Sequence, residues 1–184
     1  MTRSRTHVHR NEHVVQFYDS DDHLAESVRD YLLPALRGGE AVIVVATDVH
    51  RDSIEAMLVG AGINLSEAAV SSRYIARRAE DVRGEVMVDG NLDGAALERV
   101  FGGAIAAARG RGRSVRLFGE MVALLWGEGD VAATLEIEAF WNRFTTEHPL
   151  SVYCAYPMTS FDRALRAADR DRISGLHSRV IPVA

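Results

Sequence analysis

Residues 41–46 read Ala-Val-Ile-Val-Val-Ala, a continuous apolar run with Gly38-Gly39 before it and Thr47-Asp48 after it. A strand that is apolar at every position has no solvent-facing side, which is typical of a parallel sheet covered on both faces. Parallel strands need long crossover connections, usually helices, so the run predicts helical segments on either side of it. This stretch therefore favours an α/β fold around a central parallel sheet.

Outward from this run, the chain alternates between strand-like and helix-like patterns. Short runs rich in β-branched and aromatic residues predict further strands over 13–18, 72–77, 114–118 and 150–155. Apolar residues at helical spacing predict helices over 22–36, 50–60, 94–109, 120–126, 130–147 and 160–173. The pattern over 79–88 is ambiguous. We therefore predict a mostly parallel central sheet with right-handed crossovers and helices on both faces.

The length of 184 residues favours a single domain. We expect a flexible basic arm over 1–12, a folded body over 13–160, and a charged C-terminal helix and tail over 161–184. The charged N-terminus has no apolar stretch after it, so it does not resemble a secretory signal, and no apolar run reaches the ~18 residues of a membrane span. Together with the single cysteine, Cys154, these features favour a cytoplasmic location.

The basic residues exclude two kinds of chemistry in their usual forms. All 21 are arginine, so the chain lacks the lysine of a Walker-type phosphate loop and the lysine amine of a Schiff-base enzyme. We therefore expect no ATPase activity. The glycine- and arginine-rich stretch 110–114 precedes a strand, whereas a phosphate loop follows one, so we interpret it as a solvated turn. The net charge of −5 disfavours a direct nucleic-acid contact.

Ligands of parallel sheets bind beyond the carboxyl ends of the strands. Tryptophans near those ends would supply apolar area and an N–H donor, while a carboxylate, an amide and an imidazole would fix the orientation of a small molecule. On this basis we select seven candidate ligand-binding residues: His13, Tyr18, Glu120, Trp126, Trp141, Asn142 and Cys154.

Several of these residues have a purely structural alternative. Glu120 follows a predicted strand and opens a predicted helix, where it equally suits a cap that complements the helix dipole. Glu138 and Asn142 lie one helical turn apart, as a hydrogen-bonded surface pair would. Both tryptophans also suit the core.

His13 and Cys154 suggest a further alternative, a base and thiol pair for nucleophilic catalysis if their two strands are neighbours. The plainer explanation is a small buried cysteine and a histidine at a strand edge. His7, His9 and His13 are too loosely spaced for a designed metal site, so we expect neither a metal nor a cofactor.

Six segments occur in an order that resembles a known family: His13–Asp19, Gly39–Ala46, Met87–Gly90, Val115–Trp126, Glu138–Asn142 and Val152–Pro157. They resemble the MEDS domain, a sensory domain of methanogen and methylotroph regulators of the dichloromethane-responsive type. The resemblance implies a RecA/KaiC-like sheet without the ATPase machinery, and a sensory role for small hydrocarbon derivatives. Arg78, Asn64 and Asn91 depart from the family's pattern, which implies an altered ligand specificity or a degenerate pocket.

The leading hypothesis is a non-catalytic sensory domain that binds a small, partly apolar organic ligand. Because the chain leaves little room for an output module, we expect the signal to pass to a separate regulatory protein (a kinase, an anti-sigma factor or a transcription factor) or through homo-oligomerisation. We expect no membrane contact. One alternative is a ligand-free adaptor in a sigma-factor or kinase network. Another is a small-molecule enzyme in which His13 acts with Cys154 or Glu120, and the least favoured is a nucleotide binder that uses arginines in place of lysine.

Overall fold

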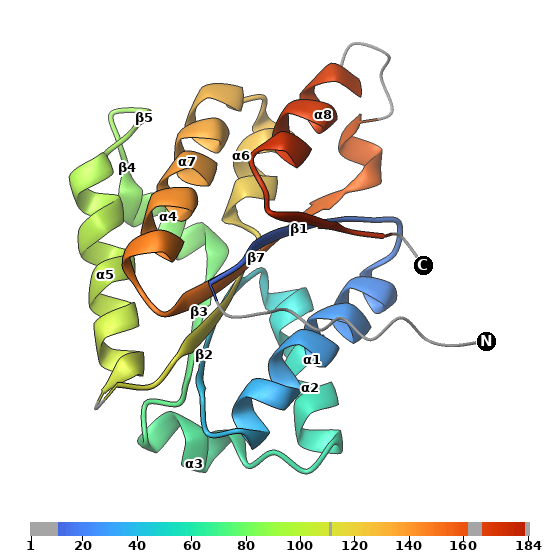
Figure 1. The fold of residues 1–184 in the computed structure, drawn as a ribbon. Helices are drawn as coiled ribbons and strands as arrows, with labels where there is room; N and C mark the ends of the chain where they lie inside the picture. Colours follow the sequence, from blue (N-terminus) through green and yellow to red (C-terminus); the bar gives the residue numbers. More distant parts are fainter. Residues whose placement is uncertain (1–10, 111, 162–166, 183–184) are drawn as a thin grey trace.

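The computed structural model describes residues 11–110, 112–161 and 167–182. Its main sheet contains β1 (His13–Tyr18), β2 (Ala41–Ala46), β3 (Tyr74–Arg78), β6 (Val115–Gly119), β7 (Leu150–Pro157) and β8 (Arg179–Ile181). The strands are ordered β3-β2-β6-β7-β1-β8, and every adjacent pair is parallel (Figure 1). The predicted α/β fold with a parallel central sheet is therefore confirmed, and it is consistent with a RecA-like arrangement.

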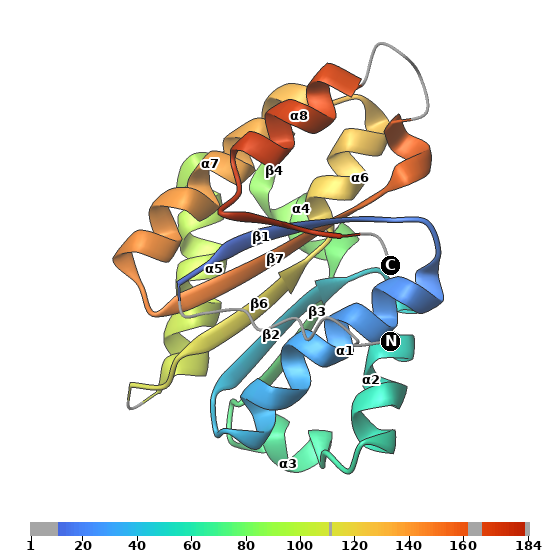
Figure 2. The same cartoon turned by 45° about the vertical axis from the view of Figure 1, so that its right-hand side comes forward.

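Helices cover both faces of this sheet, as Figure 2 shows. One face is covered by α1 (Asp21–Arg37), α2 (Asp48–Gly60) and α3 (Leu65–Val70). The other is covered by α4 (Ala79–Val86), α5 (Gly94–Arg109), α6 (Met121–Glu128) and α7 (Val131–Glu147), with α8 (Ala167–Gly175) beside them. Successive side chains of each strand alternate between the two resulting cores, so every position of β2 is buried. Among the described residues, no helix combines the length and the apolar character needed to cross a bilayer.

The structure resolves the segment that the sequence left ambiguous. Residues 79–88 form α4 and then enter a two-stranded hairpin, β4 (Met87–Val88) with β5 (Asn91–Leu92). The turn residues Asp89 and Gly90 both have positive φ angles, of 50° and 78°. Aspartate and glycine tolerate that conformation, which suits the tight turns of hairpins.

The C-terminal segment differs from the predicted helix and tail. A 3-10 turn over Met158–Phe161 follows β7, residues 162–166 lie outside the described residues, and α8 then runs to Gly175. Beyond α8, β8 adds an edge strand that pairs with β1. Three residues are too few to show a strand pattern, so their place in the sheet comes from pairing and not from local propensity. Residues 1–10 of the predicted basic arm also lie outside the described residues.

Candidate functional site

The carboxyl ends of β2 and β6 hold a buried carboxylate, that of Glu120. Its Oε1 accepts the Thr47 N–H at 2.7 Å and its Oε2 lies 2.7 Å from His50 Nδ1. The other ring nitrogen of His50 lies 3.2 Å from a carboxylate oxygen of Asp21. The hydrogen bond with Glu120, aided by both negative charges, raises the pKa of His50 to about 9. His50 is therefore an imidazolium at neutral pH, and its ring is contacted edge-on by Tyr18.

This arrangement argues against the capping interpretation of Glu120, whereas a contact with a ligand stays a prediction. Glu120 is the N-cap residue of α6, but its side chain makes no capping hydrogen bond. Instead, both of its oxygens bind groups that follow β2, so the carboxylate ties the ends of two neighbouring strands together. We refer to Tyr18, Asp21, Thr47, His50 and Glu120 as the carboxyl-end cluster.

A small apolar crevice lies next to this cluster, on the opposite face of the sheet. It is lined by Val45, Phe101, Gly119, Met121, Val122, Ile137 and Trp141. The Trp141 ring meets that of Phe101 edge to face, with centroids 4.6 Å apart. The crevice has a volume of about 10 Å³, which is room for a single water molecule. It therefore needs to widen before any organic molecule can enter.

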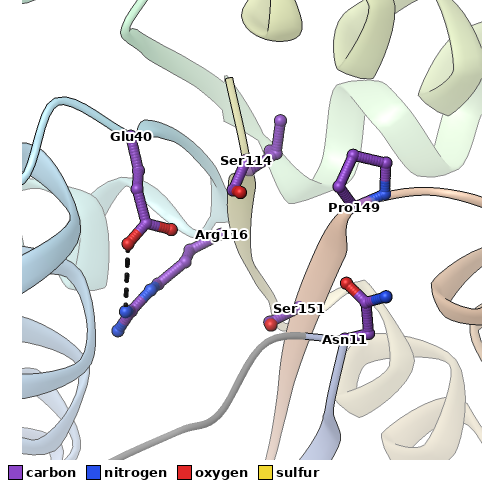
Figure 3. Close-up of a pocket in the computed structure, with 7 residues that line it drawn as sticks. Asn11, Glu40, Ser114, Arg116, Pro149 and Ser151 are labelled. Atoms are coloured by element: carbon purple, nitrogen blue, oxygen red, sulfur yellow. Dashed lines mark hydrogen bonds and ion pairs between the residues drawn. The ribbon is translucent and has the colours of Figure 1, made fainter. Parts of the chain in front are cut away.

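A second small cavity lies at the amino ends of the strands (Figure 3). Its lining includes Asn11, Pro149 and Ser151, and its volume is also about 10 Å³. Two of its other lining residues, Arg116 and Glu40, form an ion pair at 3.3 Å. Since these charges already satisfy each other, the cavity is most simply structural.

Another set of polar side chains is buried between the sheet, α7 and the C-terminal segment. This buried polar cluster consists of His13, Glu138, Asn142, Cys154, Tyr156 and His177. Its centre is the Glu138 carboxylate, which is completely inaccessible to solvent. Glu138 Oε2 lies 3.0 Å from His13 Nε2, 3.3 Å from His177 Nε2 and 3.4 Å from Cys154 Sγ. Its Oε1 accepts a hydrogen bond from the Tyr156 hydroxyl.

The electrostatics of this cluster favour a charged Glu138 and a neutral Cys154. Burial alone raises the pKa of Glu138, but the neighbouring His177 and His13 outweigh it and hold that pKa well below its usual range. Burial raises the pKa of the Cys154 thiol well above its ordinary value, and the Glu138 charge adds to the effect. The thiolate that nucleophilic chemistry needs is therefore disfavoured, although Cys154 Sγ lies only 3.5 Å from His13 Nε2.

Four of these side chains offer donor atoms suited to a metal. His13, Glu138, Cys154 and His177 each present one nitrogen, oxygen or sulfur ligand atom, and those atoms all lie within 4.8 Å of one another. Such a set of nitrogen, oxygen and sulfur donors is typical of zinc sites.

The structure brings three of the sequence-predicted residues together. His13, Asn142 and Cys154 all belong to the buried polar cluster, because β1 and β7 are adjacent and parallel and α7 packs over them. The condition set for a His13 and Cys154 pair, that their strands be neighbours, is therefore met. Trp126 packs close by, with its ring edge-on to that of Tyr156.

The other predicted residues lie elsewhere. Tyr18 and Glu120 belong to the carboxyl-end cluster, and Trp141 lines the apolar crevice. His13 and Tyr18 are the first and last residues of β1, so about 17 Å of extended chain separates them. A single small ligand that contacts all seven residues is incompatible with this placement.

Six members of these clusters were not among the sequence candidates: Asp21, Thr47, His50, Glu138, Tyr156 and His177. Glu138 was expected in a surface pair with Asn142, but both side chains turn inward and bind His13. The alternation of apolar and polar residues in α7 hid this, because the helix is buried on two adjacent faces. His50 lies in the first turn of α2, directly after the carboxyl end of β2. Because ligand sites of parallel sheets lie at such strand ends, its position could have been predicted from the sequence. His177 follows α8 in a segment without any pattern, and no signal marks it.

The comparison with protein families agrees with the sequence resemblance. A search of curated proteins finds no significant match to this chain. The family model described as MEDS, the MEthanogen/methylotroph, DcmR Sensory domain, matches residues 12–170. This range contains β1 to β7 and all the helices that line the apolar crevice. Because the match extends over most of the chain, the protein belongs to the MEDS family of sensory domains.

Proposed function

We propose that this sensory domain binds a small, partly apolar organic molecule in the crevice beside Trp141 and passes the signal to a separate regulatory protein. The observation that carries the proposal is the position of the crevice, at the carboxyl ends of β2 and β6. Parallel sheets bind their ligands at that edge. The lining suits a hydrocarbon or halogenated group, since Phe101 and Trp141 offer aromatic faces and Gly119 exposes backbone.

Helix α7 connects the crevice with the rest of the molecule. Ile137 and Trp141 line the crevice, while the residues that directly follow them, Glu138 and Asn142, belong to the buried polar cluster. A ligand that widens the crevice has to displace one or more of the helices α5, α6 and α7 that line it. Because binding signals only through a difference in affinity between two conformations, this displacement is the step that we assign to signalling.

The state of the polar residues supports a non-catalytic role. Cys154 is inaccessible to solvent and its thiol is held protonated. Glu120 lies in the carboxyl-end cluster with both oxygens engaged, whereas His13 contacts Asn142 and Glu138. Neither combination therefore offers an accessible nucleophile with a base.

The loop after β1 supports the loss of phosphate binding from a RecA-like scaffold. A phosphate loop follows a strand and opens a helix, where backbone N–H groups and the helix dipole attract anions. Here that position holds Asp19, Asp21 and Asp22 at the start of α1. Three carboxylates there repel a phosphate, and the chain has no lysine to offset them.

The departures from the family's pattern have local explanations. Arg78 forms an ion pair with Asp48 at 3.0 Å, Asn64 caps α3, and Asn91 bonds within the hairpin turn. None of the three is among the described residues that line the crevice. We therefore regard the crevice as functional and expect its specificity to follow from its own lining.

Tryptophan fluorescence provides the test. Trp126→Phe leaves Trp141 as the reporter, and this variant is titrated with a panel of short alcohols, ketones and halogenated alkanes while its thermal midpoint is recorded. We expect at least one compound to shift both the emission and the midpoint. Val122→Leu fills the crevice and should abolish the response, whereas Val88→Leu, at an exposed site, should leave it intact. A panel that leaves wild-type and variant proteins unchanged refutes the proposal.

A ligand-free adaptor is the second candidate, and one observation favours it. Both cavities described above hold no more than about one water molecule, so the packed core needs no ligand to complete it. An adaptor would co-purify with a protein partner and retain that partner in extracts stripped of small molecules, whereas a sensor would respond to the ligand.

A further inference from the structure

We propose that His13, Glu138, Cys154 and His177 form a binding site for a zinc ion, which fastens the C-terminal segment to the body of the domain. The proposal is independent of the organic ligand proposed above, because it rests on a different set of side chains. The closing experiment also uses a different probe, so either idea can fail without the other.

The separations between the donor atoms match a tetrahedral ion. His13 Nε2, Cys154 Sγ and His177 Nε2 lie 3.0 Å, 3.4 Å and 3.3 Å from Glu138 Oε2, and the sulfur lies 3.5 Å from His13 Nε2. Tetrahedral zinc with bonds of about 2.0–2.3 Å places its ligand atoms roughly 3.3–3.8 Å apart. The cluster therefore needs only small shifts to enclose an ion.

Hydrogen bonds outside the donor set aim both imidazoles at the centre. His177 Nδ1 lies 2.7 Å from the Ile173 carbonyl oxygen, which only accepts, so Nδ1 carries the proton. His13 Nδ1 lies 3.0 Å from Asn142 Oδ1 and donates in the same way. In a neutral ring the opposite nitrogen, Nε2, then carries a lone pair. Both Nε2 atoms point at Glu138 Oε2, so this convergence needs either protons on the imidazoles or a metal cation among the three atoms.

The remaining polar atoms complete this pattern. His177 Nε2 is fully buried and makes no well-aligned hydrogen bond among the described residues, although Glu138 Oε2 lies 3.3 Å from it. Tyr156 donates to Glu138 Oε1, which leaves Oε2 free to ligate. Outer contacts of this kind orient the ligands of metal sites and are as much a part of them as the ligands. The cluster thus contains four donor residues, and three of them, His177, His13 and Glu138, each have an outer hydrogen bond that orients them.

Charge balance favours a divalent ion. The Glu138 carboxylate is buried away from arginine, and the basic groups that contact it within the described residues are the two histidines. Zinc with one carboxylate, one thiolate and two neutral imidazoles has no net charge, which removes the cost of a buried ion. Binding releases the thiol proton of Cys154 to solvent as the sulfur–metal bond forms.

A zinc ion at this site would link the C-terminal segment to the body of the domain, and we call this role a clasp. Three ligands come from β1, α7 and β7, whereas His177 lies between α8 and β8. The family match ends at residue 170, so this fourth ligand lies beyond it. Zinc would hold α8 and β8 against the body of the domain, and its loss would release them.

Cobalt provides the spectroscopic test. The full chain is reduced, stripped by a chelator and titrated with Co²⁺, and then with Zn²⁺ as a competitor. We expect the intense visible bands of tetrahedral cobalt, a near-ultraviolet thiolate band, and a single ion per chain by elemental analysis. Cys154→Ser should remove the thiolate band, and His177→Gln should weaken binding while circular dichroism shows a folded protein. A His7→Gln, His9→Gln variant controls for the N-terminal histidines and should bind as wild type does.

Two further measurements separate a clasp from incidental binding. Tyr156→Phe removes the outer hydrogen bond to Glu138 and should lower the zinc affinity about 10–100-fold. Zinc should also slow hydrogen exchange over residues 167–182 in the wild type and leave it unchanged in His177→Gln. The proposal is overturned if the stripped protein binds no cobalt, shows only the weak spectrum of octahedral cobalt, or loses binding in the His7, His9 variant. The cluster would then be a proton-sharing network.

Discussion

Replacement of Glu120 by glutamine tests the electrostatics of the carboxyl-end cluster. The pKa of His50 is about 9 in the folded protein, against about 6.5 in an unfolded chain. A group whose pKa is raised on folding stabilises the fold fully below its unfolded pKa, and this contribution disappears as the pH rises through its folded pKa. The ion pair of His50 with Glu120 should therefore stabilise the protein at pH 6.5 and below, and contribute little above pH 9.

The magnitude follows from the same two pKa values. Their difference corresponds to about 3 kcal/mol in the free energy of unfolding when the imidazole is fully protonated. Part of it arises from Asp21, whose carboxylate is exposed and screened by solvent. We therefore expect Glu120→Gln to lower the free energy of unfolding by about 1–2 kcal/mol at pH 6.5. Glutamine preserves the shape and still accepts the Thr47 N–H, so the fold should be retained.

The assay is urea unfolding, followed by circular dichroism, at intervals between pH 6 and pH 9.5. The difference between wild type and Glu120→Gln should shrink steadily as the pH rises. Cys154 also lowers the stability of both proteins in alkali, because its thiol ionises more readily when unfolded, but this effect cancels in the difference. Glu40→Gln is the matched control, because it removes an ion pair with Arg116, which stays charged throughout this pH range. The difference in unfolding free energy between wild type and Glu40→Gln should therefore not vary with pH. Parallel curves for wild type and Glu120→Gln would refute the reasoning.

Three further substitutions test the packing that positions the sites. Tyr153→Phe removes the hydroxyl that donates to Gln16 Oε1 at 2.6 Å and should cost about 1–3 kcal/mol in urea unfolding; an unchanged midpoint would mean that the buried Gln16 finds another donor. Asp130→Ala removes the N-cap that accepts the Ala133 N–H and should cost about 1 kcal/mol, with faster hydrogen exchange confined to the first turn of α7. Ile43→Ala empties a buried position of β2 and should cost about 2–5 kcal/mol; a thermal midpoint close to that of the wild type would contradict the central place of β2.

The sequence predicts most of the fold because its strongest patterns coincide with its most buried elements. The apolar run 41–46 is a strand buried at every position, and 150–155 is the core of β7. The elements that escaped prediction are short: they include α3 with six residues, β8 with three, and the hairpin strands β4 and β5 with two each. Their existence depends on packing and pairing, which local propensity does not encode.

The candidate sites were predicted less completely, for a physical reason. The ends of strands can be recognised in the sequence, and for this reason Tyr18 and Glu120 were selected as candidates. The buried polar cluster instead depends on which strands are neighbours, because β7 pairs with β1 although 131 residues separate the end of one from the start of the other. Periodicity within one segment cannot predict that adjacency. His177 joins the cluster from the short loop between α8 and β8, where the sequence shows no helix or strand pattern.

The two proposed sites share α7, and this has a thermodynamic consequence. A ligand that widens the crevice by moving Trp141 also moves Asn142 and Glu138, which hold His13 and His177. If the widened state separates the zinc ligands, the organic ligand weakens zinc binding by a certain factor. Linkage then requires zinc to weaken the organic ligand by the same factor. A domain built in this way would report its ligand by releasing α8 and β8, so the sensing event and the freed C-terminal segment would be two aspects of one equilibrium.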